Sequence, residues 1–213
     1  MKKKLCIILL FLFFCFSSNR SIARDKDLRI RMGVELQKEI SDRLVLELIP
    51  EIRLQSRNEL DELFIETGLQ YDLFKYLKIG GLYRAYLHEE KVTHRFAADV
   101  KPQIKWQHLK FQYRFRYTNY TDFDLATEEN TETIRHRLKV DFKIPKTAVV
   151  PYIGTELFQN TSSEKQKKIR YISGMKIKLN KGSSINAYYL IQKRLKKTKT
   201  RQILGFSFLI ELK

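Results

Sequence analysis

The sequence predicts an all-β protein, an antiparallel, up-and-down transmembrane β-barrel of about 10–12 strands. Three observations support this prediction: an export signal at the N-terminus, a two-residue alternation of apolar and charged side chains, and connectors that alternate between short and long. No window of the chain shows convincing helical periodicity, so a helical or mixed domain is not expected.

The alternation is clearest in Leu109–Thr118. Every second residue of this segment is apolar or aromatic, and the residues between them are Lys, Gln, Arg or Thr. Successive side chains of a strand point to opposite faces, so one face is apolar and the other basic. A soluble sandwich would bury the apolar face. A transmembrane barrel would place it in lipid and turn the basic face toward a wet or ion-paired lumen.

Residues 1–23 are predicted to be a cleaved signal peptide, which leaves 24–213 as one barrel domain. Lys2–Lys4 form the positive region and Leu5–Phe16 the apolar region, and small residues precede the expected cleavage after Ala23. An apolar run of this length is too short to span a membrane as a helix.

The mature chain is expected to be free of cysteine and strongly basic. Cys6 and Cys15 both lie in the predicted signal, so the mature chain has no disulfide and no thiolate site. The whole chain carries a net charge of +17 at pH 7. Such an excess indicates an anionic partner, which is nucleic acid, a lipid headgroup or an anion in the lumen. Export argues against nucleic acid.

The segments after the signal alternate in polarity one after another to the end of the chain, and turn residues separate them. Eleven are counted, although single-chain bacterial barrels normally have an even number. Either one strand is missed, with Arg24–Asp27 as a candidate short strand, or one segment is split or unpaired, and the interruptions at Pro50 and Pro102 mark the expected places. The predicted strands are Leu28–Gln37, Leu44–Arg57, Glu62–Leu73, Leu77–His88, Val92–Trp106, Leu109–Thr118, Ile134–Ile144, Val149–Gln159, Ile169–Leu179, Ser184–Gln192 and Gln202–Leu212.

The connectors favour a barrel over a sandwich, because short periplasmic turns and longer outer loops alternate along an outer-membrane barrel. The predicted short connectors are 40–43, 74–76, 107–108, 145–148 and 180–183, and the predicted longer ones are 57–61, 89–91, 121–133, 160–168 and 194–201.

Charged residues of both signs fall on the strand face opposite the apolar one. Charges within a membrane span are tolerated where they are paired or wet. We therefore expect an ion-paired lumen that fills and stiffens the barrel, or a narrow pore whose basic excess favours anions. The predicted lumen residues are Arg29, Arg31, Glu47, Glu51, Arg53, Glu66, Arg84, Arg95, Asp99, Arg114, Arg116, Arg135, Arg137, Asp141 and Glu156.

Two of the later connectors are rich in basic residues. With the C-terminus on the periplasmic side, both connectors lie outside, where they are predicted to contact lipopolysaccharide phosphates. A solvated charged loop is the plainer interpretation. The residues are Lys165, Lys167, Lys168, Arg194, Lys196, Lys197, Lys199 and Arg201.

The sequence gives little support for a metal site, a cofactor site or an enzyme active site. The histidines, among them His136, form no HxxxH or HExxH pair, so neither a metal nor another cofactor is predicted. An outer-leaflet lipid acyl-hydrolase would use His136 with Ser162, Ser163 or Ser173. No matching motif is present, and an enzyme is not expected. A secreted soluble β-sandwich that binds a ligand is the third alternative.

Three stretches carry a resemblance: ELQKEISDRLVLELIPEIRL in the first hairpin, RFRY, and PYIGTELF. Together with the signal peptide they resemble a family of Gram-negative outer-membrane β-barrels of unknown function. The resemblance covers essentially the whole mature chain and implies no catalytic residue. It implies a Gram-negative outer-membrane location, contact with lipid and lipopolysaccharide, and insertion by periplasmic chaperones and the barrel-assembly machinery.

Overall fold

The computed structural model describes residues 27–55, 59–87, 92–122, 131–161, 168–195 and 197–212, with the side chains of 27, 120–122, 131 and 197–199 left out. This part of the chain consists of eleven strands and the connectors between them. The strands are β1 (Asp27–Ser41), β2 (Leu44–Leu54), β3 (Leu60–Phe74), β4 (Leu77–Leu87), β5 (Val92–Trp106), β6 (Leu109–Asp122), β7 (Thr131–Phe142), β8 (Val149–Asn160), β9 (Lys168–Asn180), β10 (Ser183–Arg194) and β11 (Lys197–Leu212).

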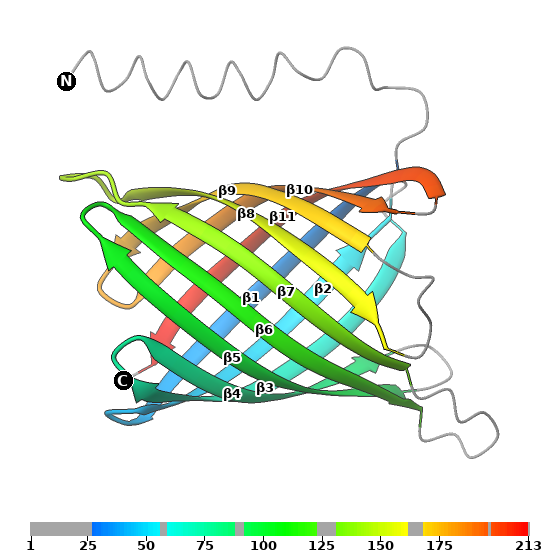
Figure 1. Ribbon diagram of the computed structural model, residues 1–213, viewed down its shortest axis with the longest axis horizontal. Helices are drawn as coiled ribbons and strands as arrows, with labels where there is room; N and C mark the ends of the chain where they lie inside the picture. The colour runs from blue at the N-terminus through cyan, green and yellow to red at the C-terminus, as the bar shows by residue number, and fades with distance from the viewer. Residues whose placement is uncertain are drawn as a thin grey trace, which may run out of the picture.

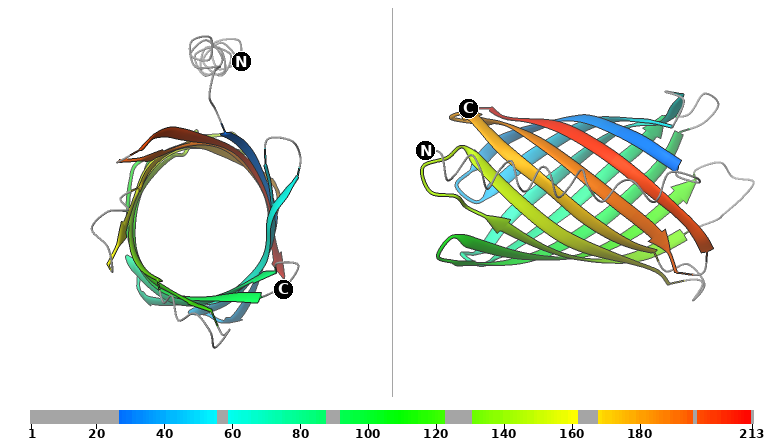
Figure 2. Two further views of the ribbon diagram at one scale, coloured as in Figure 1. Left: turned by 90° about the vertical axis from the view of Figure 1, so that its right-hand side faces the viewer. Right: turned by 90° about the horizontal axis from the view of Figure 1, so that it is seen from above.

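The strands form one closed barrel in which each strand pairs with its neighbours in the chain. All these pairs are antiparallel, and they run tilted around the barrel axis (Figure 1). A view along the axis shows the closed ring of strands (Figure 2). Closure satisfies the backbone N–H and C=O groups that an open edge would leave in hydrocarbon, as a membrane-spanning sheet requires. The predicted all-β transmembrane barrel is confirmed.

The barrel closes through a parallel pair, in which Asp27 of β1 lies opposite Arg201 of β11 and Lys38 opposite Leu212. An odd number of up-and-down strands leaves the first and last running in the same direction, so only parallel pairing can close the ring. The expectation that one of the eleven segments is split or unpaired is therefore wrong. The end of β1 and the C-terminal end of β11 lie together at the end of the barrel with the short turns (Figure 1).

Pro50 and Pro102 both lie inside strands rather than at breaks. Pro50 pairs with Ile65 of β3, and Pro102 pairs with Leu77 of β4. On their other sides the ladders skip these residues without a change of register. Proline has no N–H to donate, so each removes a local ladder bond while the strand continues.

The two kinds of connector lie at opposite ends of the barrel, as predicted, but two of them differ from the predicted kind in length. β11 begins at Lys197, so the predicted long connector 194–201 shortens to 195–196. β7 ends at Phe142, and the predicted short connector lengthens to 143–148. A turn at Pro145–Ala148 ends β7 early, with the Thr147 hydroxyl bonded to the carbonyl of Ile144.

The outer surface of the barrel is apolar along its length. Large hydrophobic side chains are exposed on every strand, among them Met32, Leu69, Ile104, Ile153 and Phe206. A soluble monomer rarely exposes so continuous an apolar surface. This surface is the band expected to face lipid. Within the described residues there is no helix of the length and apolarity needed to cross a membrane.

Candidate functional site

One cavity of about 1070 Å³ occupies the lumen of the barrel. Its wall includes Arg29 and Thr93 near the end with the long connectors and Gln37 and Lys110 near the end with the short turns. The cavity therefore extends along most of the length of the strands. Basic side chains outnumber acidic ones among its lining residues.

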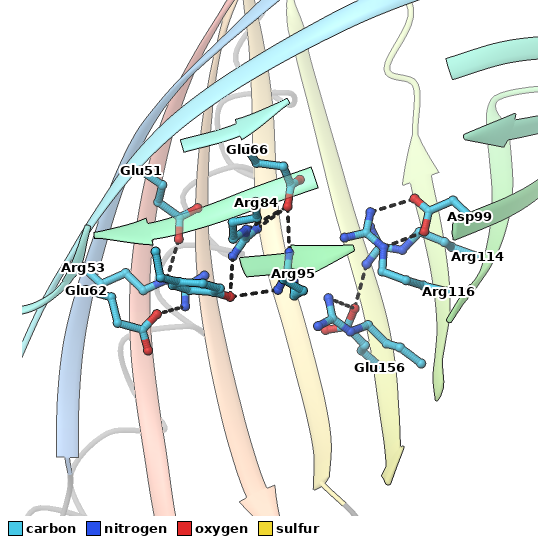
Figure 3. Close-up of polar contacts among 12 residues, drawn as sticks. Glu51, Arg53, Glu62, Glu66, Arg84, Arg95, Asp99, Arg114, Arg116 and Glu156 are labelled. Carbon is cyan, nitrogen blue, oxygen red and sulfur yellow. Dashed lines mark hydrogen bonds and ion pairs between the residues drawn. The ribbon is translucent and has the colours of Figure 1, made fainter. Parts of the chain in front are cut away.

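The structure places every predicted lumen residue on the inner face. All except Asp99 and Asp141 line the cavity, and these two carboxylates lie beside it in ion pairs with Arg116 and Lys139. Figure 3 shows the labelled side chains in two groups, one around Glu66 and Arg53 and the other around Asp99 and Glu156. Each group joins residues of several strands.

The first group is centred on Glu66 of β3. Its carboxylate accepts hydrogen bonds from Arg84 Nε at 2.8 Å and from Arg95 Nη2 at 2.7 Å. Both arginines also donate to the Tyr86 hydroxyl, at 3.2 Å and 2.9 Å. Arg84 and Arg95 lie directly opposite each other on β4 and β5, where like charges repel. The negative charge of Glu66, which is bonded to both arginines, offsets this repulsion.

Phe64 forms an apolar floor under this group. Its side chain is fully buried on the lumen face, and the guanidinium groups of Arg84 and Arg53 lie 3.6 Å and 4.6 Å from its ring centroid. Arg53 in turn is bonded to Glu51 at 2.6 Å and to Glu62. Stacking on a ring face holds guanidinium planes in place, so Phe64 fixes the positions of both arginines.

The second group begins with a two-point ion pair between Arg116 and Asp99. Arg116 Nε and Nη2 donate to the two oxygens of Asp99 at 2.5 Å and 2.7 Å. The Asp99 side chain is fully buried, and that of Arg116 is 5% exposed. Parallel double bonds of this kind fix both position and angle of the guanidinium.

Glu156 of β8 gathers the remaining arginines of the second group. Arg114 Nη2 donates to it at 2.8 Å and Arg170 Nη1 at 3.1 Å, and Arg135 Nη1 lies 3.7 Å away. Arg135 and Arg170 also stack on Phe158, which repeats the role of Phe64 in the first group. One carboxylate here serves three arginines.

Lysines and arginines divide the lumen along its axis. Most lysines of the cavity wall lie near the ends of their strands at the short turns, as Lys110 does at the start of β6 and Lys139 at the end of β7, whereas Lys168 lies at the end with the long connectors. The arginines occupy the middle and the half toward the longer connectors, where the carboxylates that hold them also lie. The arginines and the carboxylates that bind them therefore lie away from the short turns.

The wall formed by the last strands is less charged than the predicted lumen face. Ile172, Leu190 and Ile203 lie there on the inner face and form a buried cluster with Tyr152, against which Tyr188 packs. Here the apolar residues of a strand point inward. Alternation alone did not assign a face to these strands.

The basic residues predicted to contact lipopolysaccharide are only partly described. Lys165, Lys167 and Lys196 lie outside the described residues, and Lys197 and Lys199 belong to β11 without described side chains. Lys168 and Arg194 face each other across β9 and β10 at the end with the long connectors. Lys168 and Arg201 line the cavity, so these two belong to the lumen rather than to an outer loop.

His136 faces outward, as its position in the alternation predicts. Its Nδ1 is hydrogen-bonded to the hydroxyl of Tyr113 at 2.6 Å, and its ring meets the ring of Phe115 edge-on. Ser173 lies two strands away on β9, opposite Ile153, and Ser162 and Ser163 lie outside the described residues. The described neighbours of His136 thus include no nucleophile for an acyl-hydrolase. No group of three or more possible metal ligands occurs in the described ranges.

Several lumen residues were missed by sequence reasoning. Arg170 lies directly opposite Glu156, and Gln192 accepts a bond from Arg170 at 2.8 Å. Glu62 pairs with Arg53 of the neighbouring strand β2, and Asp61 pairs with Arg29 of β1, on the far side of β2. The available signal was the parity of β9, where Arg170 lies an even number of residues from Lys168 and Lys176.

The chain also matches the model of a protein family. The model of a family described as "Protein of unknown function (DUF2490)" matches residues 32–202. The chain belongs to the DUF2490 family. No curated protein sequence matches the chain.

Two solved structures are similar to this DUF2490 barrel. The first is a bacterial polysaccharide outer membrane secretin, with a TM-score of 0.54 and 11% identity over 82% of this chain and 67% of the secretin. The second is an anion-selective porin from Comamonas acidovorans, with a TM-score of 0.42 and 9% identity over 78% of this chain and 57% of the porin. At such identities the likeness to the secretin shows the fold alone. With its apolar outer surface and continuous lumen, this fold is that of an outer-membrane barrel or channel.

Proposed function

We propose that this DUF2490 barrel is a narrow passage through the outer membrane that prefers anions. The observation that carries the proposal is the lumen cavity, whose lining reaches toward both ends of the barrel and is predominantly basic. Fixed charges of one sign in a low-dielectric tube raise the local concentration of the opposite ion. A barrel stiffened only by ion pairs would need no such excess of arginine and lysine.

The similar solved structure is described as a bacterial polysaccharide outer membrane secretin. That description belongs to the secretin, and it supports only the general idea of passage through a barrel of this shape. Arg84, Arg95 and Arg116 of the adjacent strands β4, β5 and β6 line the cavity, and their long side chains take up space in it. We therefore expect small conductance rather than a wide pore.

The test is conductance of the full chain, purified from the outer-membrane fraction, in a planar bilayer under a KCl gradient. We expect single-channel steps and a reversal potential whose sign reports chloride preference. Lys110→Glu, which inverts one charge of the lumen wall, should shift the reversal potential toward cations. Lys193→Glu makes the same change at an exposed position on the outer face and should leave it unchanged. A silent or cation-preferring barrel overturns the proposal.

Contact between the outer basic residues and lipopolysaccharide is a separate proposal. Arg194 is exposed at the end with the long connectors, and a cation there suits a phosphate headgroup. Replacing Lys165, Lys167 and Arg194 by Gln should lower outer-membrane integrity under detergent stress, and unchanged integrity would remove the idea. Recognition by periplasmic chaperones and the barrel-assembly machinery, and export by the signal peptide, stay predictions.

A further inference from the structure

The strongest concentration of positive charge in the lumen is a block of four arginines on two adjacent strands, β6 and β7. Arg114 lies directly opposite Arg137, and Arg116 lies directly opposite Arg135. Like charges directly opposite each other on a sheet destabilise it. Some negative charge must therefore stand near this block in the folded barrel.

The described carboxylates do not supply enough of it. Asp99 is bound to Arg116 by two hydrogen bonds. Glu156 is shared between Arg114 and Arg135 of the block and also Arg170 of β9. Two carboxylates thus face five guanidinium groups, and the remaining charge is positive.

Arg137 is the member of the block with the fewest bonds. It makes no hydrogen bond and no ion pair with another described residue. Its cross-strand partners are Arg114 on β6 and Glu156 on β8, and its side chain lines the cavity. The Nε atoms of Arg114, Arg135 and Arg137 lack a hydrogen-bond partner among the described residues and are buried from the cavity, so an anion in the lumen would contact the terminal nitrogens of these guanidinium groups. A buried N–H without a partner is costly, and a charged one more so.

We propose that the face made by Arg114, Arg135 and Arg137, beside Glu156, binds an oxyanion group of the phosphate or sulfate kind that carries at least two negative charges. Such a group accepts several N–H bonds at once and matches the fork of donors on a guanidinium. A single chloride satisfies fewer donors and less of the charge. This inference names a class of solute for the proposed anion passage. It rests on that proposed function, because the oxyanion must reach the site through the lumen.

The site lies at mid-height in the lumen, between the lysines near the short turns and the arginines toward the long connectors. An anion that enters from the short turns passes Lys110 and Lys139 first and meets the arginine block afterwards. The block is therefore the place where a multivalent solute dwells longest.

The experiment measures binding of inorganic pyrophosphate to the full chain in detergent micelles by titration calorimetry, with sodium chloride at equal ionic strength as the reference. We expect pyrophosphate to bind and the binding to weaken as salt is raised, because screening acts on charges in a wet lumen. A parallel titration with sulfate, a divalent oxyanion without phosphorus, tests whether the site requires a phosphate group or only two negative charges.

Arg137→Gln is the informative variant. Because Arg137 holds no partner among the described residues, its loss breaks no ion pair there and relieves repulsion from Arg114, so the barrel should keep its heat-dependent gel mobility. We expect pyrophosphate affinity to fall at least about tenfold. Lys110→Gln removes the same charge from the same cavity and should change affinity by less than about threefold. Glu156→Gln removes the competing carboxylate and should tighten binding.

Three results would overturn the site: no pyrophosphate binding above the chloride reference, an unchanged affinity in Arg137→Gln, or equal losses in Arg137→Gln and Lys110→Gln. Binding in micelles needs no conduction. A barrel that binds pyrophosphate and passes no current overturns the passage and keeps the site, whereas chloride-preferring current without pyrophosphate binding overturns the site alone.

Discussion

The phenol ring of Tyr188 on β10 occupies the space that a β-carbon at residue 205 of β11 would need. The two residues are direct cross-strand partners, and Gly205 alone leaves room for the ring. The same relationship recurs between Tyr152 and Gly174 on β8 and β9, where the ring and the neighbouring carbonyl of Ala187 crowd the glycine. Two tyrosines are thus fitted against two glycines on the inner wall near the closing strands.

We therefore expect Gly205→Ala to destabilise the barrel by about 1–3 kcal/mol, the usual cost of overpacking a fitted site. The measurement is the urea midpoint for loss of the fast-migrating form on unboiled gels. Gly81→Ala is the matched control, since a β-carbon at Gly81 meets no atom within 4 Å and it should leave the midpoint nearly unchanged. Equal effects of the two substitutions would contradict the steric explanation.

The ion pair between Asp99 and Arg116 should contribute strongly because both side chains are buried. Arg116→Gln leaves a buried carboxylate without its main partner, and we expect a loss of about 3–5 kcal/mol in unfolding free energy. Lys78→Gln breaks a much more exposed pair with Asp72 and should cost at most about 1 kcal/mol. In the double variant Asp99→Asn/Arg116→Gln most of the loss should be recovered, and a loss equal to the sum of the single variants would argue against coupling.

The hydrogen bond between Tyr113 and His136 lies on the outer face of the barrel. In hydrocarbon no water can replace a lost partner, so the Tyr113 hydroxyl and the His136 ring nitrogen satisfy each other's hydrogen-bonding capacity. Tyr113→Phe should therefore destabilise the barrel by about 1–2 kcal/mol. Tyr113→Phe combined with His136→Phe should restore most of the stability. If His136→Phe instead abolished a lysophospholipid-releasing activity of the purified protein, the lipid-hydrolase alternative would return.

The parallel closure gives a prediction that an even-numbered barrel would not share. Ile30 lies opposite Leu204, and six residues further along both strands Leu36 lies opposite Ile210. Cysteine pairs at 30/204 and at 36/210 should both form disulfides, because paired strand residues lie within disulfide reach. The mismatched pair 30/210 should not. The chain's own cysteines, Cys6 and Cys15, lie in the predicted signal and would not interfere after cleavage. Cross-linking of 30/210 in preference to 36/210 would exclude the parallel register.

Much of the fold followed from local pattern. The alternation of Leu109–Thr118 predicted β6 and its two faces, and the same pattern located all eleven strands to within a few residues at most ends. The predicted strand ends were wrong where the local sequence suggests a turn or loop but the structure continues the strand. The strand pattern of β1 runs on to Ser41, through residues expected to turn, and β11 begins at Lys197, inside an expected loop. Backbone pairing with a neighbouring strand extends a strand past its local signals.

The charged lumen was less predictable than the strands. The inward position of Arg114 and Glu156 followed from parity alone, but the sharing of Glu156 with Arg170 depends on the register between β8 and β9. The apolar inner wall at Ile172, Leu190 and Ile203 shows the limit of the simple rule that apolar residues face lipid. Apolar side chains on the inner face of a barrel can pack against each other and so form a small hydrophobic core away from water.

The sequence by itself determined that the chain forms about 10–12 strands with one apolar and one charged face, because side-chain alternation is a property of consecutive residues. Only the tertiary structure decided how the ring closes and which charges meet. The parallel pairing of β1 with β11 joins residues from opposite ends of the chain. The crowding of Arg114, Arg135 and Arg137 around one carboxylate likewise depends on which strands lie side by side and in which register. Neither relationship is recorded in the order of neighbouring residues.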